Sequence, residues 1–164
     1  MKKNVSNFMK LLSLTMMLAL IVPVVTNAQA GKANFAGSWT LNEAKSTMPE
    51  GGGGMRGGGS FVVTQEANLL TRTTTGQDGT QRVTKYTLDG KESVNTSARG
   101  DSKSIAKWSA DGKTLNIATT RTTDNGERKS TEAWSLTDAK TLSIASTFTT
   151  QDGESKMTIV YDKK

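Results

Sequence analysis

WSADGKTLNIATTRTTDNGERKSTEAWSLTDAKTLSIASTFTTQDGESKMTIVY, residues 108–161, is the stretch that decides the fold. Short runs that alternate between apolar and polar residues are separated by four turn sequences: Ala110-Asp111-Gly112-Lys113, Asp124-Asn125-Gly126, Thr137-Asp138-Ala139-Lys140 and Gln151-Asp152-Gly153. Asn-Gly and Asp-Gly supply the positive φ angles that tight hairpin turns require, and between alternating runs they are a strong hairpin signal. The stretch therefore predicts a ladder of antiparallel β-hairpins.

Pairing residues across the turns tests this ladder. With Asn125-Gly126 as a two-residue loop, and the other turns treated alike, the predicted cross-strand pairs are Ile117 with Trp134, Arg121 with Ser130, Trp108 with Leu115, Trp134 with Leu142, and Ile144 with Tyr161. All the large apolar residues then share one face of the sheet. A slip of one residue would move every side chain to the other face, so this agreement supports the predicted faces.

An internal repeat indicates how the sheet continues. Trp108-Ser109 recurs 26 residues later as Trp134-Ser135, and each copy is followed by a similar Lys-Thr-Leu strand. One repeat is therefore an up-and-down pair of strands, and a meander of such pairs removes its unpaired edges by closing into a barrel. Counting strand candidates from Gly37 onward, the sequence predicts an all-β, antiparallel, up-and-down meander closed into a barrel of about 8–10 strands.

Residues 1–30 have the pattern of a secretory signal peptide. Lysines precede an apolar run at 11–25, and Ala28-Gln29-Ala30 is a small-x-small cleavage site. The apolar run is too short to favour a retained membrane span. We predict cleavage after Ala30, no stable membrane insertion afterwards, and a periplasmic or secreted location.

The remaining residues, 31–164, have the length of one domain. The leader carries three lysines and no acidic residue, so its removal lowers the formal net charge from +6 to +3. No long basic run or aromatic stacking motif is left to indicate nucleic acid binding. The chain has no cysteine, which excludes disulfides and a cysteine-linked lipid anchor. We expect a monomer that is stabilised by its sheet and core.

A glycine-rich segment at 51–59 lies between the first two predicted strands. So many glycines do not hold one conformation cheaply, which predicts a flexible loop. It is not a phosphate-binding loop, because no Gly-Lys-Ser/Thr sequence and no helix follow it. Two interpretations stay open: a plain linker, or a mobile lid over a barrel mouth.

The segment NFAGSWTL at 34–41 opens the predicted domain. Gly37 and Trp39 match the G-x-W motif, and the segment resembles the opening of lipocalins and of the wider calycin barrels, avidins included. Together with the later W-S-x-D-G-K-T-L and V-Y-D-K sequences, it is similar to exported lipocalin-like proteins of Gram-negative bacteria. The resemblance implies a barrel in which Trp39 closes one end under the first strand. It also implies the binding of a small molecule.

Catalysis is not expected from this composition. The chain has no histidine and no cysteine, which removes the commonest general base, the commonest metal ligands and every thiol nucleophile. Most aspartates fall in predicted turns, where their carboxylates shape the backbone. The sequence therefore predicts a non-enzymatic protein without a metal site or cofactor.

The inner face of the predicted barrel is apolar at one end and polar toward Asn125-Gly126. The candidate ligand-binding residues on this face are Arg82, Trp108, Arg121, Arg128, Glu132 and Trp134. The face occupied by Arg72 stays open, because a change of one residue in the loop at Asp78-Gly79 would move it to the other side of the sheet.

Two interpretations of the polar end compete. In the first, Arg121 and Glu132 form a salt bridge, and the polar end is simply the wet mouth of the barrel. In the second, the arginines favour an anionic or polar ligand, while Trp108 and Trp134 form an apolar floor. The sequence thus predicts an exported barrel that binds or carries a small hydrophobic or amphipathic molecule, anionic ones included. The alternative is a structural or envelope-interaction barrel with a filled core.

Overall fold

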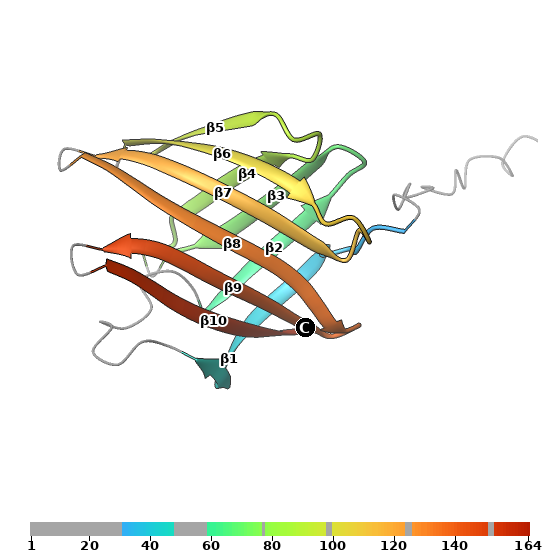
Figure 1. Ribbon diagram of the computed structural model, residues 1–164. Helices are drawn as coiled ribbons and strands as arrows, with labels where there is room; N and C mark the ends of the chain where they lie inside the picture. Colours follow the sequence, from blue (N-terminus) through green and yellow to red (C-terminus); the bar gives the residue numbers. More distant parts are fainter. Residues whose placement is uncertain (1–30, 48–58, 77, 98–99, 124–125, 151–152) are drawn as a thin grey trace, which may run out of the picture.

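The computed structural model describes residues 31–47, 59–76, 78–97, 100–123, 126–150 and 153–164. The predicted signal peptide and all of the predicted glycine-rich loop except Gly59 lie outside these residues. Within them the backbone forms ten β-strands and no helix (Figure 1). The all-β prediction and the expected strand number are therefore confirmed. No helix in these ranges is long and apolar enough to span a membrane.

The ten strands follow one another along the chain, and every two consecutive strands except β4 and β5 pair antiparallel. Their bounds are β1 (Gly37–Thr47), β2 (Ser60–Gln65), β3 (Leu69–Thr75), β4 (Gln81–Thr87), β5 (Glu92–Ser97), β6 (Gly100–Trp108), β7 (Thr114–Thr123), β8 (Gly126–Asp138), β9 (Thr141–Thr150) and β10 (Gly153–Lys163).

One sheet contains all ten strands in the order β4-β3-β2-β1-β10-β9-β8-β7-β6-β5. The strand β1 pairs antiparallel with both β2 and β10, so it joins the two halves of the meander. The sheet curls until β3 and β4 lie behind β6 and β7 (Figure 1). This brings the two edge strands, β4 and β5, next to each other, and the barrel is nearly closed.

Side chains bridge the seam between β4 and β5. The Asn95 side chain accepts a hydrogen bond from the Lys85 backbone N–H (2.8 Å) and donates one to the Lys85 carbonyl (2.9 Å). Nearby, the Thr87 backbone N–H donates to the Ser93 hydroxyl (2.8 Å). These bonds take the place of a backbone ladder and protect edge groups that would otherwise be unpaired.

The predicted register of the β7–β8 hairpin is wrong by two residues. Trp134 pairs with Leu115 rather than with Ile117, and Arg121 pairs with Arg128 rather than with Ser130. The cause is the role of one glycine. Gly126 has a positive φ of 95° but pairs with Thr123 as the first residue of β8, so it is not a loop residue.

The same displacement occurs in the two hairpins that follow. Trp134 pairs with Ile144 rather than with Leu142, and Ile144 pairs with Ile159 rather than with Tyr161. The predicted pair of Trp108 with Leu115 is confirmed. Because the displacement is an even number of residues, every side chain stays on its predicted face.

An aromatic plug fills the end of the barrel where β1 begins, which we call the closed end. Phe35 is fully buried there. Its ring stacks on Trp108 at 5.8 Å between centroids and meets the edge of Trp134 at 5.9 Å. Its carbonyl accepts a hydrogen bond from Trp39 Nε1 (2.8 Å), and its N–H donates to the Gln65 side chain (2.9 Å). The segment before β1 thus belongs to the core.

Gly37 and Trp39 also lie at the closed end. Trp39 is fully buried, and the Lys163 ammonium lies 5.3 Å from the centre of its ring. Gly37 has a φ of 141°, and a Cβ atom there would lie 2.5 Å from Lys163 Cε. The neighbour is the flexible end of a lysine side chain, so the requirement for glycine here comes from the positive φ angle.

Four of the turn aspartates have the backbone-shaping role predicted for them. The carboxylates of Asp78, Asp89, Asp111 and Asp138 each accept a hydrogen bond from the backbone N–H two residues further on, at 2.7 to 3.1 Å. These bonds are the main cause of a lowered pKa for Asp78, Asp89 and Asp138, whereas for Asp111 the hydrogen bond from the Ser109 hydroxyl lowers the pKa most and the backbone bond adds to it. Asp124 and Asp152 lie outside the described residues.

We expect Phe35→Ala to lower the free energy of unfolding by about 3–5 kcal/mol, because it empties a packed aromatic site. Urea denaturation followed by tryptophan fluorescence measures the change. The control is Val94→Ala, which shortens a side chain of 58% relative exposure and is expected to change stability by less than about 0.5 kcal/mol. Equal stabilities of the two variants would show that the plug is not part of the folded core.

Candidate ligand-binding site

Along β7 and β8, the inward-facing side chains change from buried at one end of the barrel to exposed at the other. On β7, Leu115 and Ile117 are buried, Thr119 is half-buried and Arg121 is exposed. On β8, burial decreases in the same way from Trp134 to Arg128. All these residues occupy alternate positions that point inward. Solvent therefore reaches the inner face from the end near the β7–β8 hairpin, which we call the open end.

Arg72 on β3 lies where the dry and wet halves meet. Its guanidinium carbon is 4.4 Å from the centre of the Phe61 ring and 5.7 Å from that of Trp134. Its Nε atom is buried and has no hydrogen-bond partner. Among the described residues no carboxylate lies within 4 Å of Arg72. The cation lies against aromatic faces and has a side-chain hydrogen bond with Tyr161, while its Nε donor is left for an anion to bind.

Glu132 on β8 is an inner carboxylate, and it is directed toward Trp134. Its Oε2 atom accepts a hydrogen bond from Trp134 Nε1 (2.8 Å). In the ladders Glu132 pairs with Ile117 and Ser146, and it is only half-buried. It thus satisfies the indole of a fully buried tryptophan and does not neutralise Arg72 through a close ion pair.

The charges of Arg72 and Glu132 both affect the pKa values of two buried tyrosines, Tyr86 and Tyr161. Burial and, secondarily, the Glu132 carboxylate raise the pKa of the Tyr86 phenol well above its ordinary value, while Arg72 opposes this. Burial also raises the pKa of Tyr161, where Arg72 opposes the shift and Glu132 adds to it. Arg72, Tyr86, Glu132 and Tyr161 therefore form one electrostatically coupled group, which we call the inner polar cluster.

Three further arginines extend the positive charge to the open end. Arg121 and Arg128 stand directly opposite each other on β7 and β8, and both are exposed. Like charges at directly opposite positions are unfavourable unless an anion lies between them. Arg82 is also exposed and pairs with Thr74 on β3. The expected salt bridge between Arg121 and Glu132 is absent from the described residues, because the corrected register separates them.

The two candidate tryptophans do not form a common floor. Trp134 is fully buried beneath Phe35, Phe61 and Arg72. Trp108 is half-buried at the closed end, where it stacks on Phe35, and its Nε1 atom has no hydrogen-bond partner. Trp108 is therefore separated from the arginines of the open end by the packed core.

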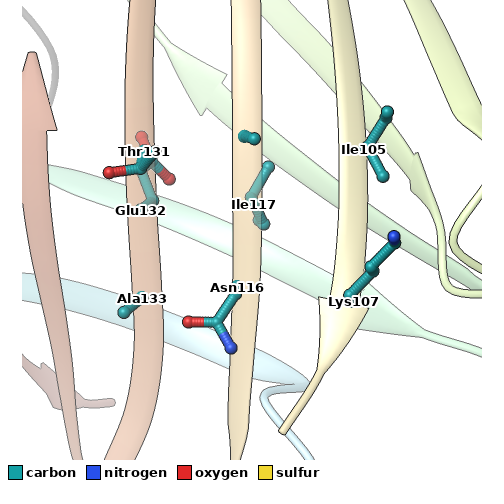
Figure 2. Close-up of a pocket in the computed structure, with 8 residues that line it drawn as sticks. Ile105, Lys107, Asn116, Ile117, Thr131, Glu132 and Ala133 are labelled. Carbon is teal, nitrogen blue, oxygen red and sulfur yellow. The ribbon is translucent and has the colours of Figure 1, made fainter.

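A depression of about 400 Å³ lies on the outer face of β6, β7 and β8 (Figure 2). Its outward-facing lining is made of Ile105, Lys107, Asn116, Ala118, Thr131 and Ala133, and the inner-face residues Ile117 and Glu132 complete it. It is on the opposite side of the sheet from Arg72. No group of three histidine, cysteine or acidic residues that could hold a metal ion occurs in the described ranges.

Comparison with known proteins identifies the architecture. The chain matches no protein-family model and no curated protein. A secretary abundant heat soluble (SAHS) protein from Ramazzottius varieornatus superposes with a TM-score of 0.56 at 10% identity, over 79% of this chain and 95% of that chain. The fold is that of a lipocalin-like β-barrel. Zebrafish ileal bile acid-binding protein complexed with cholic acid superposes equally well, at 0.56 and 16% identity, over 79% of this chain and 98% of that one.

The sequence did not decide whether Arg72, which is central to the site in this lipocalin-like barrel, faces inward or outward. Arg72 pairs with Thr84, and Leu70 pairs with Tyr86, so Arg72 shares the inner face with Tyr86. The sequence contained a signal for this face. Once the register of the hairpin is known, Leu70 lies opposite Tyr86 and Arg72 lies opposite Thr84, so all four side chains share one face. Phe35 had a weaker signal, because its burial depends on the distant Gln65.

We expect both tyrosines of the chain to resist ionisation at about pH 10 while the protein is folded, because the pKa of each is raised. Tyrosinate absorbance during alkaline titration measures this, and denaturant should release both groups at once. The unfolded chain ionises first, so the associated stability is full below about pH 10 and is lost as the pH rises toward the folded-state values. Ordinary titration of either tyrosine in the folded protein would contradict the buried cluster.

Proposed function

We propose that the protein binds a small amphipathic molecule that carries an anionic group, inside the open half of the barrel and without catalysis. The observation that carries this proposal is Arg72, a guanidinium that lies over Phe61 and Trp134 with a buried, unpartnered Nε atom. A carboxylate, sulfate or phosphate would satisfy such a group through charge-assisted hydrogen bonds. The aromatic faces beside it would hold the apolar part of the same molecule.

The charge of the inner face supports an anionic ligand. Arg72, Arg82, Arg121 and Arg128 all occupy inward positions, and among the described strand residues that pair with them or with their neighbours, Glu132 supplies an inward carboxylate. The three exposed arginines stand at the open end and would attract an anion before it reaches Arg72. Glu132 is already bonded to Trp134, and a lone inner carboxylate without histidine or cysteine offers little for acid–base catalysis.

Export belongs to the same proposal. The signal-peptide pattern of residues 1–30 would place a monomeric barrel in the periplasm or outside the cell. A carrier there would hold its cargo without contacting nucleic acid or inserting into a membrane. The solved zebrafish protein is a bile acid-binding protein with cholic acid bound, and a related use of this barrel is consistent with the unpartnered Nε atom of Arg72.

A structural barrel without a ligand is the second candidate, and a specific observation favours it. The closed half is packed with fully buried side chains, among them Trp39, Leu115, Trp134 and Leu142. If the open half were also filled in solution, the protein would act through its outer surface. Ligand binding at Arg72 distinguishes the two functions.

The test is calorimetric titration of dodecanoate into the protein purified from its producing cells. We expect binding that weakens about 10- to 100-fold in Arg72→Gln, because charge-assisted hydrogen bonds are lost. Arg72→Lys should retain part of the affinity, since it keeps the charge but not the planar fork. Binding should also change the emission of Trp134, whose ring lies 5.7 Å from the guanidinium.

Lys107→Gln is the matched control, because it removes one positive charge from the outer face. Its affinity for dodecanoate should equal that of the unmodified protein. Binding that is equally strong in Arg72→Gln, or no binding by the unmodified protein, would favour the structural barrel.

A further inference from the structure

The seam between β4 and β5 differs from every other junction in the sheet, because no backbone ladder joins these two strands. Side chains bridge it instead, since the backbone groups of Lys85 bond to Asn95 and the N–H of Thr87 bonds to Ser93. Both strands are edges of the sheet, and a sheet edge is a template for pairing with another chain. Within the described residues, the seam is therefore where the barrel wall can still accept a strand.

Two residues at the start of β4 keep unpaired backbone groups at this edge. In an antiparallel ladder, the backbone groups of alternate residues point to opposite neighbours. The Arg82 carbonyl accepts a hydrogen bond from the Thr74 hydroxyl on β3 (3.4 Å), whereas the backbone groups of Lys85 face β5. Gln81 and Val83 alternate with Arg82 and so also face β5. In the described part of the chain, no backbone hydrogen bond reaches them from that strand.

Exposed apolar side chains gather on the outer face around the seam. Val83 on β4 and Val94 on β5 are 50% and 58% exposed. The other two large apolar residues that are exposed in the described ranges, Val62 and Ile105, lie on the nearby strands β2 and β6. Apolar side chains that gather on one surface indicate contact with a partner. A strand bound at the seam would therefore be apolar on its outward side.

The inward side of the same edge is positively charged. Arg82 is exposed and points inward, and no carboxylate of the described residues lies within 4 Å of it. An acidic side chain beside it would complement this charge. Because successive residues of a strand point to opposite faces, a segment that fits the seam alternates apolar residues, which point outward, with acidic residues, which point inward.

We infer that the β4 edge binds an extended segment of a partner protein in which apolar and acidic residues alternate. Its backbone would bond to Gln81 and Val83, and its acidic side chains would face Arg82. The incoming strand would also take over the two bonds that Asn95 makes to Lys85. Asn95 thus holds the seam closed while no partner is bound. This interaction concerns the barrel wall and does not depend on a ligand in the interior.

Hydrogen exchange of the purified protein, followed by NMR, tests this inference. In the absence of a partner, the Val83 amide should exchange at least tenfold faster than the Thr84 amide, which faces β3. The probe is a capped seven-residue peptide in which glutamate and valine alternate. Its control has the same composition with the three valines in one block. The alternating peptide should bind about tenfold more tightly and, at saturation, slow exchange at Gln81 and Val83 at least tenfold.

Three variants separate charge from backbone pairing. Arg82→Glu should weaken binding of the glutamate peptide about tenfold and favour a lysine–valine peptide of the same length, because the inward charge is reversed. Lys129→Glu is the matched control, since it reverses a charge on the outer face of β8, and it should leave peptide binding unchanged. Asn95→Ala should strengthen binding about fivefold, because it removes the side chain that competes for Lys85.

Three results would overturn the inference. Slow exchange of Val83 in the protein alone would show that the edge is already paired. Equal affinities for the alternating and block peptides, or an affinity unchanged in Arg82→Glu, would contradict the chemistry assigned to the partner. Protection of Val83 without peptide, in dimers detected by analytical ultracentrifugation, would assign the edge to a second copy of the chain instead.

Discussion

Every second residue of ten strands points into one enclosed interior, and the rest of the structure follows from how that interior is filled. A closed sheet removes its edges only if its inner side chains pack together or bind water. The aromatic plug meets this requirement at the closed end, where Phe35 is in contact with Trp108 and Trp134. In the open half, the described inward positions carry hydroxyls, arginines and the half-buried Phe148.

This division explains why a charged residue can lie so deep. An arginine in a fully packed core would need a carboxylate partner, because an unpaired buried charge is strongly unfavourable. Arg72 lies at the boundary instead, half-buried, with Phe61 and Trp134 on the dry side and the solvent-accessible inner face on the other. Glu132 stays bonded to Trp134, so the boundary keeps a net positive character. The same position suits a bound anion.

The architecture could be predicted from the sequence because turn sequences and the alternation of apolar and polar residues depend only on neighbouring positions in the chain. They predicted the strands and the inner face correctly, although Gly126 was placed in the loop and not in the ladder. The observed register differs from the predicted one by two residues, which leaves each side chain on its predicted face. In the observed register Arg121 lies opposite Arg128, and the expected salt bridge with Glu132 does not form. Arg72 and Phe35 were harder, since the first depends on the register of a hairpin and the second on contacts with residues far along the chain.

The central claim is that the open half of the barrel is accessible and that the Nε atom of Arg72 is available there to an anion. Its most direct test is an experimental structure of the purified protein soaked with bromide, whose anomalous signal locates the ion. The account predicts bromide or ordered water beside the Arg72 guanidinium, with Glu132 still bonded to Trp134. An ion pair between Arg72 and Glu132, with side chains filling the interior around it, would contradict the account.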